Sequence, residues 1–587
     1  MRKLVLLLGA ILPRTILCTP IGGPIEYKAD PILITGVLSR TPEGYVPTRR
    51  EFRDLQVNFT DTWNLYLLGL RSFQLVNQTD PLSYYEIAGI HGKPWKEWQG
   101  AKGEREGGYC PHNNNLFFGW HRPYLALYEQ ELYKHVQTIA SQFPSHLHDR
   151  YTTAAHDFRI PYWDWGLGDA AGELPELFVS PTVDVIGTSG EPETIPNPLY
   201  RYDFNPLMPG DFSGKWTQYT HTLRWPSTYG PDAVSRDQKF IENYSRLRNA
   251  YRDKLAQGFS RTNISMNSFS KTYIEDPHGW LHYAIGGGDG DDKAPKEAWG
   301  HMWPSEYSGF EPVFWLVHAN VDRLFTLFTT LHPSTRITPQ ATNTSNMWIA
   351  PGSTLDATTP LLPFWRTDTE FWTTEMVYDE TVLGYAYPES QYWLYSTKEE
   401  WRESVRKRVG ELYYERTREM LDPVRKDGKV GALAGVLDQG GGYKEWDLRV
   451  SGSRRTGSGG GVLGVEIAGR EVGMWTGLGG GGNREDVGGS GGLVEMQGMV
   501  PLTAALLEEV QAGRLRSLEK GDVVRFLRGR LGWKWVAGGS GSEVMQGLVI
   551  DIVSTRARIP EDRGMLVEYE EDWEVHEVIS GMGGGFV

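Results

Sequence analysis

The chain has 587 residues, of which 40% are hydrophobic and 12% aromatic, a composition typical of folded rather than disordered proteins. This length exceeds what a single hydrophobic core usually holds, so we expect at least two domains. The formal net charge is −15 at pH 7. A nucleic-acid partner requires a basic face, which no motif here builds, so that class of partner is excluded and small neutral partners remain compatible.

The chain begins with Met1, Arg2 and Lys3, followed by an apolar run over residues 4–12. This pattern predicts a signal peptide over residues 1–20 and therefore a secreted protein, with an intracellular location as the alternative. The run is too short to span a membrane, and no other apolar stretch is long enough, so we expect no membrane partner. Acceptor patterns for N-glycosylation agree with secretion and occur at Asn58, Asn77, Asn243, Asn263 and Asn343.

A first set of histidines comprises His91, His112 and His121. From His121 onward, apolar residues recur every three or four positions, so this histidine opens an amphipathic helix. His112 lies instead in a loop rich in asparagine. The motifs around the three imidazoles contain no acidic ligand.

A second set begins with His278 and His282, which are four residues apart and therefore share one helix face. Asp276 has the residue type of a helix N-cap and Pro277 suits the first helical position, while glycines at 286–288 end the segment. The pair predicts a short helix that presents two nitrogens to a metal. Such pairs also occur on solvated helices without a metal.

His318 lies in an apolar helical stripe that Pro333 ends. Burying an imidazole without a partner is costly, so this residue is either a hydrogen-bonded core histidine or a metal ligand. Together with His278 and His282 it gives a second set of three imidazoles, and such a donor set suits copper or zinc better than iron. Two such sets, largely on helices, predict a site for a metal pair inside a helical bundle.

These motifs resemble those of the tyrosinase family of type-3 copper proteins, most closely the long fungal tyrosinases. The blocks that carry the resemblance cover residues 47–55, 83–91, 120–130, 276–282, 311–323 and 384–389. The resemblance implies a mainly α-helical catalytic domain over residues 21–414, with a four-helix bundle that houses a dicopper centre. It further implies a linker over 415–442 and a β-rich C-terminal capping domain over 443–587.

By this resemblance, two copper ions would each be held by three histidines, one by His91, His112 and His121 and the other by His278, His282 and His318. The only cysteines are Cys18 and Cys110. The resemblance implies a thioether between Cys110 and His112, and the alternative is a free buried thiol. The remaining histidines show no ligand spacing. For His301 we expect a structural hydrogen bond.

The resemblance also implies dioxygen-dependent oxidation of phenolic small molecules to o-quinones. Glu275 would hold a water near copper, and Phe314 would stack on the substrate ring. Gly279 stands where relatives carry an asparagine, and Tyr283 and Ser305 would alter the shape of the pocket mouth. We therefore expect efficient o-diphenol oxidation and weaker monophenol hydroxylation.

Three alternative functions use the same residues: an o-aminophenol oxidase, a non-catalytic dioxygen carrier, and a binding domain with structural zinc. In relatives, the C-terminal domain caps the pocket until a protease removes it, so an activating protease is a further expected partner. No cysteine follows Cys110, so the copper-loading Cys-x-x-Cys of some relatives is absent, and residues 482–488 show no clear aromatic plug.

Overall fold

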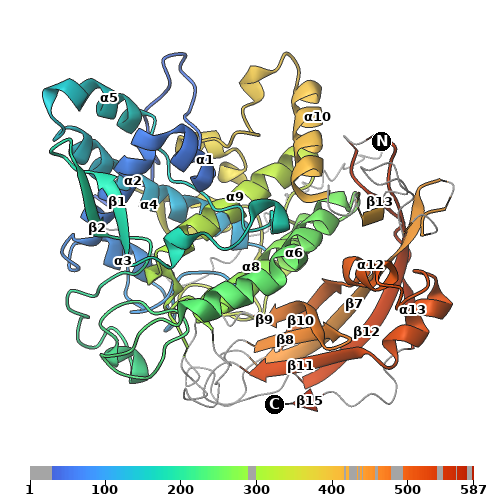
Figure 1. The fold of residues 1–587 in the computed structure, drawn as a ribbon. Coiled ribbons are helices and arrows are strands. Elements are labelled where there is room, and N and C mark those ends of the chain that lie inside the picture. The colour runs from blue at the N-terminus through green and yellow to red at the C-terminus, as the bar shows by residue number, and fades with distance from the viewer. Residues whose placement is uncertain are drawn as a thin grey trace, which may run out of the picture.

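The protein is described by a computed structural model that shows a helical part and a β-rich part (Figure 1). The described residues are 30–287, 299–414, 418, 420–421, 433, 436–438, 440–455, 461–477, 493–537, 546–562, 565–577 and 585–586. The predicted architecture, a mainly α-helical domain followed by a β-rich one, is confirmed. The predicted signal peptide, most of the predicted linker and residues 482–488 lie outside the described residues.

The helical part contains ten α-helices among its described residues. They are α1 (Phe52–Asn58), α2 (Thr60–Gln74), α3 (Tyr84–Gly89), α4 (Phe117–Ala140), α5 (Ser145–His156), α6 (Asp237–Ser260), α7 (Met266–Ser268), α8 (Asp276–Gly286), α9 (Val313–Leu331) and α10 (Lys398–Val409). Two π-helical turns, η4 (Phe269–Glu275) and η9 (Gly410–Tyr414), continue α7 and α10. Three short hairpins are β1 (Thr182–Ile186) with β2 (Pro192–Pro196), β3 (Gln340–Ala341) with β4 (Thr354–Leu355), and β5 (Pro360–Thr367) with β6 (Glu370–Thr373). Single 3₁₀ turns are η1 (Gly168–Ala171), η2 (Glu176–Phe178), η3 (Gly214–Gln218), η5 (Ser308–Phe310), η6 (Glu375–Val377), η7 (Glu380–Leu383) and η8 (Tyr392–Leu394).

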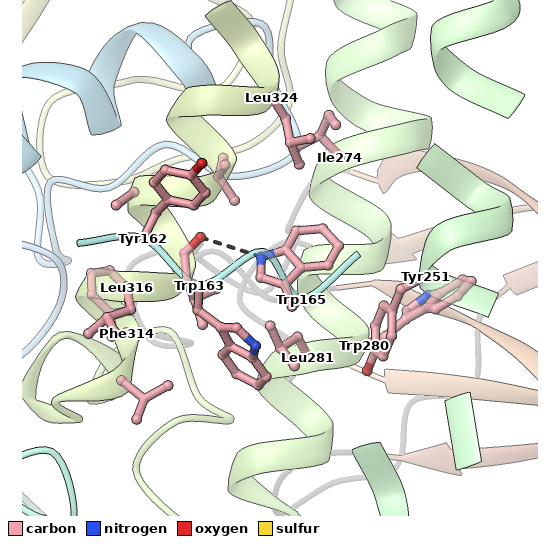
Figure 2. Packing of buried hydrophobic residues seen from close by; sticks show 14 of the residues in the cluster. Tyr162, Trp163, Trp165, Tyr251, Ile274, Trp280, Leu281, Phe314, Leu316 and Leu324 are labelled. Atoms are coloured by element: carbon pink, nitrogen blue, oxygen red, sulfur yellow. Dashed lines mark hydrogen bonds between the residues drawn. The ribbon is translucent and has the colours of Figure 1, made fainter. Parts of the chain in front are cut away.

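The predicted bundle is formed by long helices that pack through apolar faces. Helix α4 contacts α2 and α9, and α6 contacts α8. Large aromatic side chains fill the space between them, as Figure 2 shows for Trp163, Trp165, Tyr251 and Trp280. A main-chain hydrogen bond lies within this packing: the N–H of Trp165 donates to the carbonyl of Trp163 at 2.9 Å. The helices that carry the histidines are therefore held in a dense core.

A buried network of ion pairs and hydrogen bonds joins the beginning and the end of the helical part. The guanidinium of Arg49 donates to Glu129 at 3.0 Å and to Asp322 at 3.3 Å, and Arg122 donates to Asp322 at 2.6 Å. The hydroxyl of Tyr387 also donates to Asp322 at 2.6 Å. Burial alone would raise the pKa of the Asp322 carboxyl, but the two guanidiniums outweigh this effect and hold it below its ordinary value. The sequence blocks at 47–55 and 384–389 thus meet on α9.

The C-terminal domain, from β7 to β15, has two sheets and two helices among its described residues. One sheet has the order β10-β7-β12-β13 with β14 also paired to β12, and the other has the order β15-β11-β8-β9. The elements are β7 (Gly442–Arg455), β8 (Gly461–Ile467), β9 (Arg470–Gly477), β10 (Leu493–Pro501), α12 (Thr503–Gln511), α13 (Lys520–Leu527), β11 (Leu531–Ala537), β12 (Gln546–Arg558), β13 (Glu568–Tyr569), β14 (Glu574–His576) and β15 (Gly585–Phe586). The domain boundaries predicted from sequence stay a prediction.

Among the described helices, none is both long enough and apolar enough to cross a membrane.

Candidate metal centre

Six histidines converge in the core as two adjacent groups. One group comprises His91, His112 and His121 with Cys110, and the other comprises His278, His282 and His318. Within each group the candidate ligand atoms lie within 4.8 Å of one another, and no histidine is more than 3% exposed. The groups are neighbours, because the ring centroids of His121 and His318 are 4.4 Å apart. The arrangement is that of a paired site.

Main-chain carbonyls fix the rings of the first group. His91 follows the end of α3, and its Nδ1 lies 2.7 Å from the carbonyl oxygen of Ser305. His121 is in the second turn of α4, where its Nδ1 lies 2.7 Å from the carbonyl oxygen of Phe117. Each contact assigns the proton to Nδ1 and leaves Nε2 as the coordinating nitrogen.

The thiol of Cys110 lies between two rings of the first group. Its Sγ is 3.5 Å from Nε2 of His112 and 3.4 Å from Nε2 of His121. Burial raises the pKa of this thiol well above its ordinary value, so it is neutral near pH 7. The thiol is therefore close to His112, while the predicted thioether stays a prediction.

Two helices carry the second group. His278 and His282 project from one face of α8, and His318 projects from α9. Nδ1 of His282 lies 2.6 Å from the carbonyl oxygen of Met302, which again leaves Nε2 free. Nε2 of His278 and Nε2 of His318 are 2.9 Å apart. Both nitrogens therefore point toward one shared position.

The chemistry of the two groups fits a metal pair. Burial lowers the pKa of all six imidazoles, and it lowers that of His282 to about 4, so each ring is neutral and offers a lone pair. Four of these six rings have a buried nitrogen without a protein partner among the described residues: Nε2 of His91, Nδ1 of His112, Nε2 of His282 and Nδ1 of His318. Such orphaned groups are costly unless something binds them. An all-imidazole set suits copper or zinc.

Two phenylalanine rings line the centre. The centroid of the predicted ring, Phe314, is 4.0 Å from that of His318 and 4.9 Å from that of His91. A second ring, Phe117, was not predicted; its centroid is 4.7 Å from that of His121. Its spacing of four residues from His121 on one helix was the signal that could have identified it.

Glu275 ends the π-helical turn η4, directly before α8. The N–H of Asn113 donates to its Oε1 at 2.6 Å, whereas Oε2 has no partner among the described residues. Burial raises the pKa of this carboxyl to about 8, and the Asn113 N–H and Lys271 oppose the shift. Without bound metal, Glu275 is therefore largely protonated at neutral pH.

The other predicted pocket residues lie beside the centre in different roles. Gly279 is buried in α8. The Tyr283 ring packs edge-on against Trp225 and Trp303, with centroids 5.8 and 5.5 Å away. Ser305 is 6% exposed and supplies the carbonyl that holds His91. Their contacts with substrate stay predictions.

Two local predictions have different outcomes. Asp276 is not an N-cap: its backbone is helical, at φ −62° and ψ −60°, because η4 runs into α8 without a break. Its carboxylate instead accepts a hydrogen bond from the indole N–H of Trp280 at 2.8 Å. The structural role expected for His301 is confirmed, since its buried Nδ1 accepts from the N–H of Leu223 at 3.0 Å.

The C-terminal domain lies directly over this region. Strands β9 and β10 lie below α8 and α6 in Figure 1, and β9 contacts α8. Residues Trp475, Thr476, Met496 and Gln497 of these strands line a small cavity together with Glu275 and its neighbours. The C-terminal domain is thus in contact with α8 and the surroundings of Glu275, while its role as a cap over the metal centre stays a prediction.

Comparison with known families gives two matches. The common central domain of tyrosinase matches residues 81–331, and the tyrosinase C-terminal domain matches residues 465–552. The first match contains all six histidines. The second contains β9 and β10.

Several curated relatives are fungal proteins. A tyrosinase of Neurospora crassa is 40% identical over 408 residues, covering 65% of this chain and 58% of that protein. A tyrosinase of Podospora anserina is 38% identical over 406 residues, covering 65% of this chain and 69% of that protein. Polyphenol oxidase 2 of Agaricus bisporus is 30% identical over 387 residues, covering 63% and 66% respectively. The matched region thus spans less than two thirds of the first of these relatives.

Solved structures share the fold over nearly the whole chain. A mushroom tyrosinase crystallised in latent and active forms superposes with a TM-score of 0.77 at 22% identity, covering 94% of this chain and all of that one. The holo-protyrosinase of Aspergillus oryzae gives a TM-score of 0.67 at 20% identity, covering 92% and 98%. The helical and β-rich parts are therefore a known combination.

Proposed function

Because this chain belongs to the tyrosinase family, we propose that it is a copper-dependent polyphenol oxidase that uses dioxygen to convert o-diphenols to o-quinones. The observation that carries the proposal is the pair of adjacent, fully buried groups of three neutral imidazoles. His91, His112 and His121 would hold one copper, and His278, His282 and His318 the other. Bound there, the copper pair would supply dioxygen activation and electron transfer.

The surrounding residues would orient substrate and exclude water. The rings of Phe314 and Phe117 pack against the histidines and keep the centre apolar. A phenol ring would stack on such a surface in an offset or edge-on manner. The carbonyls of Ser305, Phe117 and Met302 would keep three imidazoles in one orientation throughout turnover.

Monophenol hydroxylation requires in addition that a phenol lose its proton. Oε2 of Glu275 has no protein partner among the described residues and would accept that proton, directly or through a water. Because the pKa of this carboxyl is raised to about 8, the group is largely protonated at neutral pH and can then accept no further proton. Gly279 supplies no side chain to orient a water where relatives carry an asparagine. We therefore propose that diphenol oxidation is the stronger activity.

The test is oxygen uptake by the copper-loaded full chain, before and after limited proteolysis within residues 415–440, with a monophenol and its matched o-diphenol. Uptake with the diphenol alone gives a catechol oxidase, and uptake with both gives a tyrosinase. Zinc-loaded protein is the control, because zinc has no redox chemistry. No uptake with either phenol contradicts the proposal, and reversible dioxygen binding without turnover would identify a carrier.

An o-aminophenol added to the same assay tests the alternative activity, o-aminophenol oxidation. An o-aminophenol oxidase would consume oxygen faster with this substrate than with the matched o-diphenol. Metal analysis of the purified protein distinguishes a copper enzyme from a domain with structural zinc.

We also propose a Cys110–His112 thioether, secretion, N-glycosylation and activation by a protease. The short distance from Cys110 to His112 supports the thioether. Four of the acceptor asparagines are exposed, at 58, 77, 263 and 343, whereas Asn243 is 8% exposed and its amide donates to the carbonyl of Lys239 at 2.8 Å. Glycosylation is therefore proposed at the four exposed sites only. Mass spectrometry of the secreted protein tests all four proposals.

A further inference from the structure

The face of α8 that points away from the metal centre is held by an unusual concentration of hydrogen bonds. Asp276 and Trp280 share this face, and they lie about 200° around the helix from His278 and His282. The carboxylate of Asp276 accepts from the ammonium of Lys254 at 3.1 Å and from the indole of Trp280 at 2.8 Å. It is 4% exposed. One buried side chain thus ties α8 to α6 and to its own next turn.

The C-terminal domain supplies the remaining donors to Asp276. The main-chain N–H of Thr476, on β9, donates to Oδ1 at 2.9 Å. The hydroxyl of Thr476 donates to the main-chain carbonyl of Asp276, also at 2.9 Å. A residue 200 positions away in sequence therefore binds both the side chain and the backbone of the first residue of α8.

Lys254 is shared between the same two domains. Its side chain is fully buried on α6, and its ammonium donates both to Asp276 and to the carbonyl of Met499 on β10. The ring of Trp280 packs against Tyr251 of α6, with centroids 5.7 Å apart, as Figure 2 shows. The outer face of α8 is therefore fixed by charge, by hydrogen bonds and by aromatic packing.

We propose that Asp276 is a positioning residue that fixes the rotation of α8 about its own axis. It thereby fixes the positions of the metal-facing nitrogens of His278 and His282, and Thr476 of the C-terminal domain supplies part of the hydrogen bonding that holds Asp276. The proposal rests on the proposed function only in taking these histidines as metal ligands. A side-chain tip lies about 5–6 Å from a helix axis, so a rotation of about 10° moves it by about 1 Å. That displacement is several times the roughly 0.2 Å tolerance of metal–ligand distances.

The C-terminal domain would thus help to hold the second metal site in shape. The observed contacts from Thr476 and Met499 reach α8 and its partner Lys254, whereas the main-chain carbonyls that hold His91 and His121 belong to the helical part. Loosening the C-terminal domain should therefore weaken the second metal site and leave the first unchanged.

The experiment compares Thr476→Val with Thr555→Val in the full chain loaded with copper. Thr555 is a matched control, because it is buried in the same domain and its hydroxyl donates to a main-chain carbonyl of that domain, that of Glu570, at 2.8 Å. The readout is the number of coppers kept per chain as a chelator is titrated. We expect Thr476→Val to release one of two coppers at about three- to tenfold lower chelator concentration than wild type or Thr555→Val. Equal release by the two variants overturns the proposal.

A second pair of variants separates positioning from simple loss of folding. Asp276→Asn should weaken retention of the second copper about 10- to 100-fold. The double variant Asp276→Asn/Lys254→Met also removes the buried ammonium whose hydrogen-bonded carboxylate the single change takes away, so its apoprotein should regain thermal stability but not copper retention. Full recovery of copper retention would show that the stranded charge was the cause, against the proposal. Retention of zinc, measured in the same chelator titration, is a second readout. It tests the positioning role even if no phenol is oxidised.

Discussion

The two histidine groups differ in what holds them in place. The rings of the first group are fixed within the helical part, by the carbonyls of Ser305 and Phe117. In the second group, His278 and His282 depend on α8, whose opposite face contacts the C-terminal domain through Thr476. Two sites with the same donor set can therefore respond differently to one perturbation, because the C-terminal domain adds to the support of the second group through Thr476.

The largest effect should follow from removing one imidazole from each group. His91→Ala and His318→Ala should each bind one metal instead of two and lower o-diphenol oxidation by about a thousandfold or more, because the two metals act as a unit. Metal analysis and oxygen uptake measure this. His221→Asn is the control, since that ring lies outside both groups. If either alanine variant kept two metals and its activity, the assignment of two equivalent groups would be wrong.

A change of pH should separate the two groups. Burial raises the pKa of the Glu445 and Asp447 carboxyls on β7 above their ordinary values, and they face Gln257 and Lys254 of α6 and Arg261 directly after it. The docked state thus binds more protons than a state with both carboxyls in water, where their ordinary pKa is about 4. The free energy of docking should therefore be most favourable near pH 4 and weaken as the pH rises above that value.

Limited proteolysis between the domains and copper retention, measured from pH 5 to pH 9, check this expectation. Cleavage should accelerate with pH, and copper should leave the second group first. Glu445→Gln cannot ionise and should flatten both profiles. A pH dependence that is unchanged in Glu445→Gln would assign the effect to other groups.

A substitution of Cys110 should affect metal binding in the first histidine group alone. Cys110→Ser removes the sulfur that lies beside His112 and His121, so copper retention in the first group should fall about tenfold while the second group is unaffected. Chelator titration measures retention. Peptide mapping of the wild type adds a direct check, because a thioether would make the Cys110–His112 peptide lighter by one molecule of hydrogen. Loss of copper from both groups alike would instead indicate general destabilisation.

The smallest effect concerns substrate choice. Gly279→Asn places an amide on α8 next to His278, and it should raise the ratio of monophenol to diphenol oxidation a few-fold. It should also stabilise the helix by a few tenths of a kcal/mol, because glycine is a poorer helix former than asparagine. Oxygen uptake with the matched phenol pair measures the ratio, and Gly279→Ala controls for the helix effect. An equal ratio in both variants would contradict a role for the amide.

The histidines of the site could be predicted from the sequence better than the groups that hold them in place. The four-residue spacing of His278 and His282, and the stripe from Phe314 to Phe328, are local helical periodicities that survive folding. The carbonyls of Ser305 and Met302 carry no side-chain signal, so their roles could not be predicted. Asp276 was interpreted as an N-cap because the π-helical turn before it depends on tertiary packing. Its contact with Thr476 crosses 200 positions and two domains.

The ionic network around Asp322 has a consequence for the order of folding. It joins Arg49 to Tyr387, 338 positions later, so the helical part cannot close until almost all of it has been synthesised. Contacts of such long range form late because loop-closure entropy must be overcome first. The ribosome nevertheless passes Tyr387 before it makes the first strand of the C-terminal domain, and the residues from Tyr387 to Thr476 take about 4–18 s to add. The newly made helical part therefore has an interval in which its histidines are assembled and Thr476 does not yet exist.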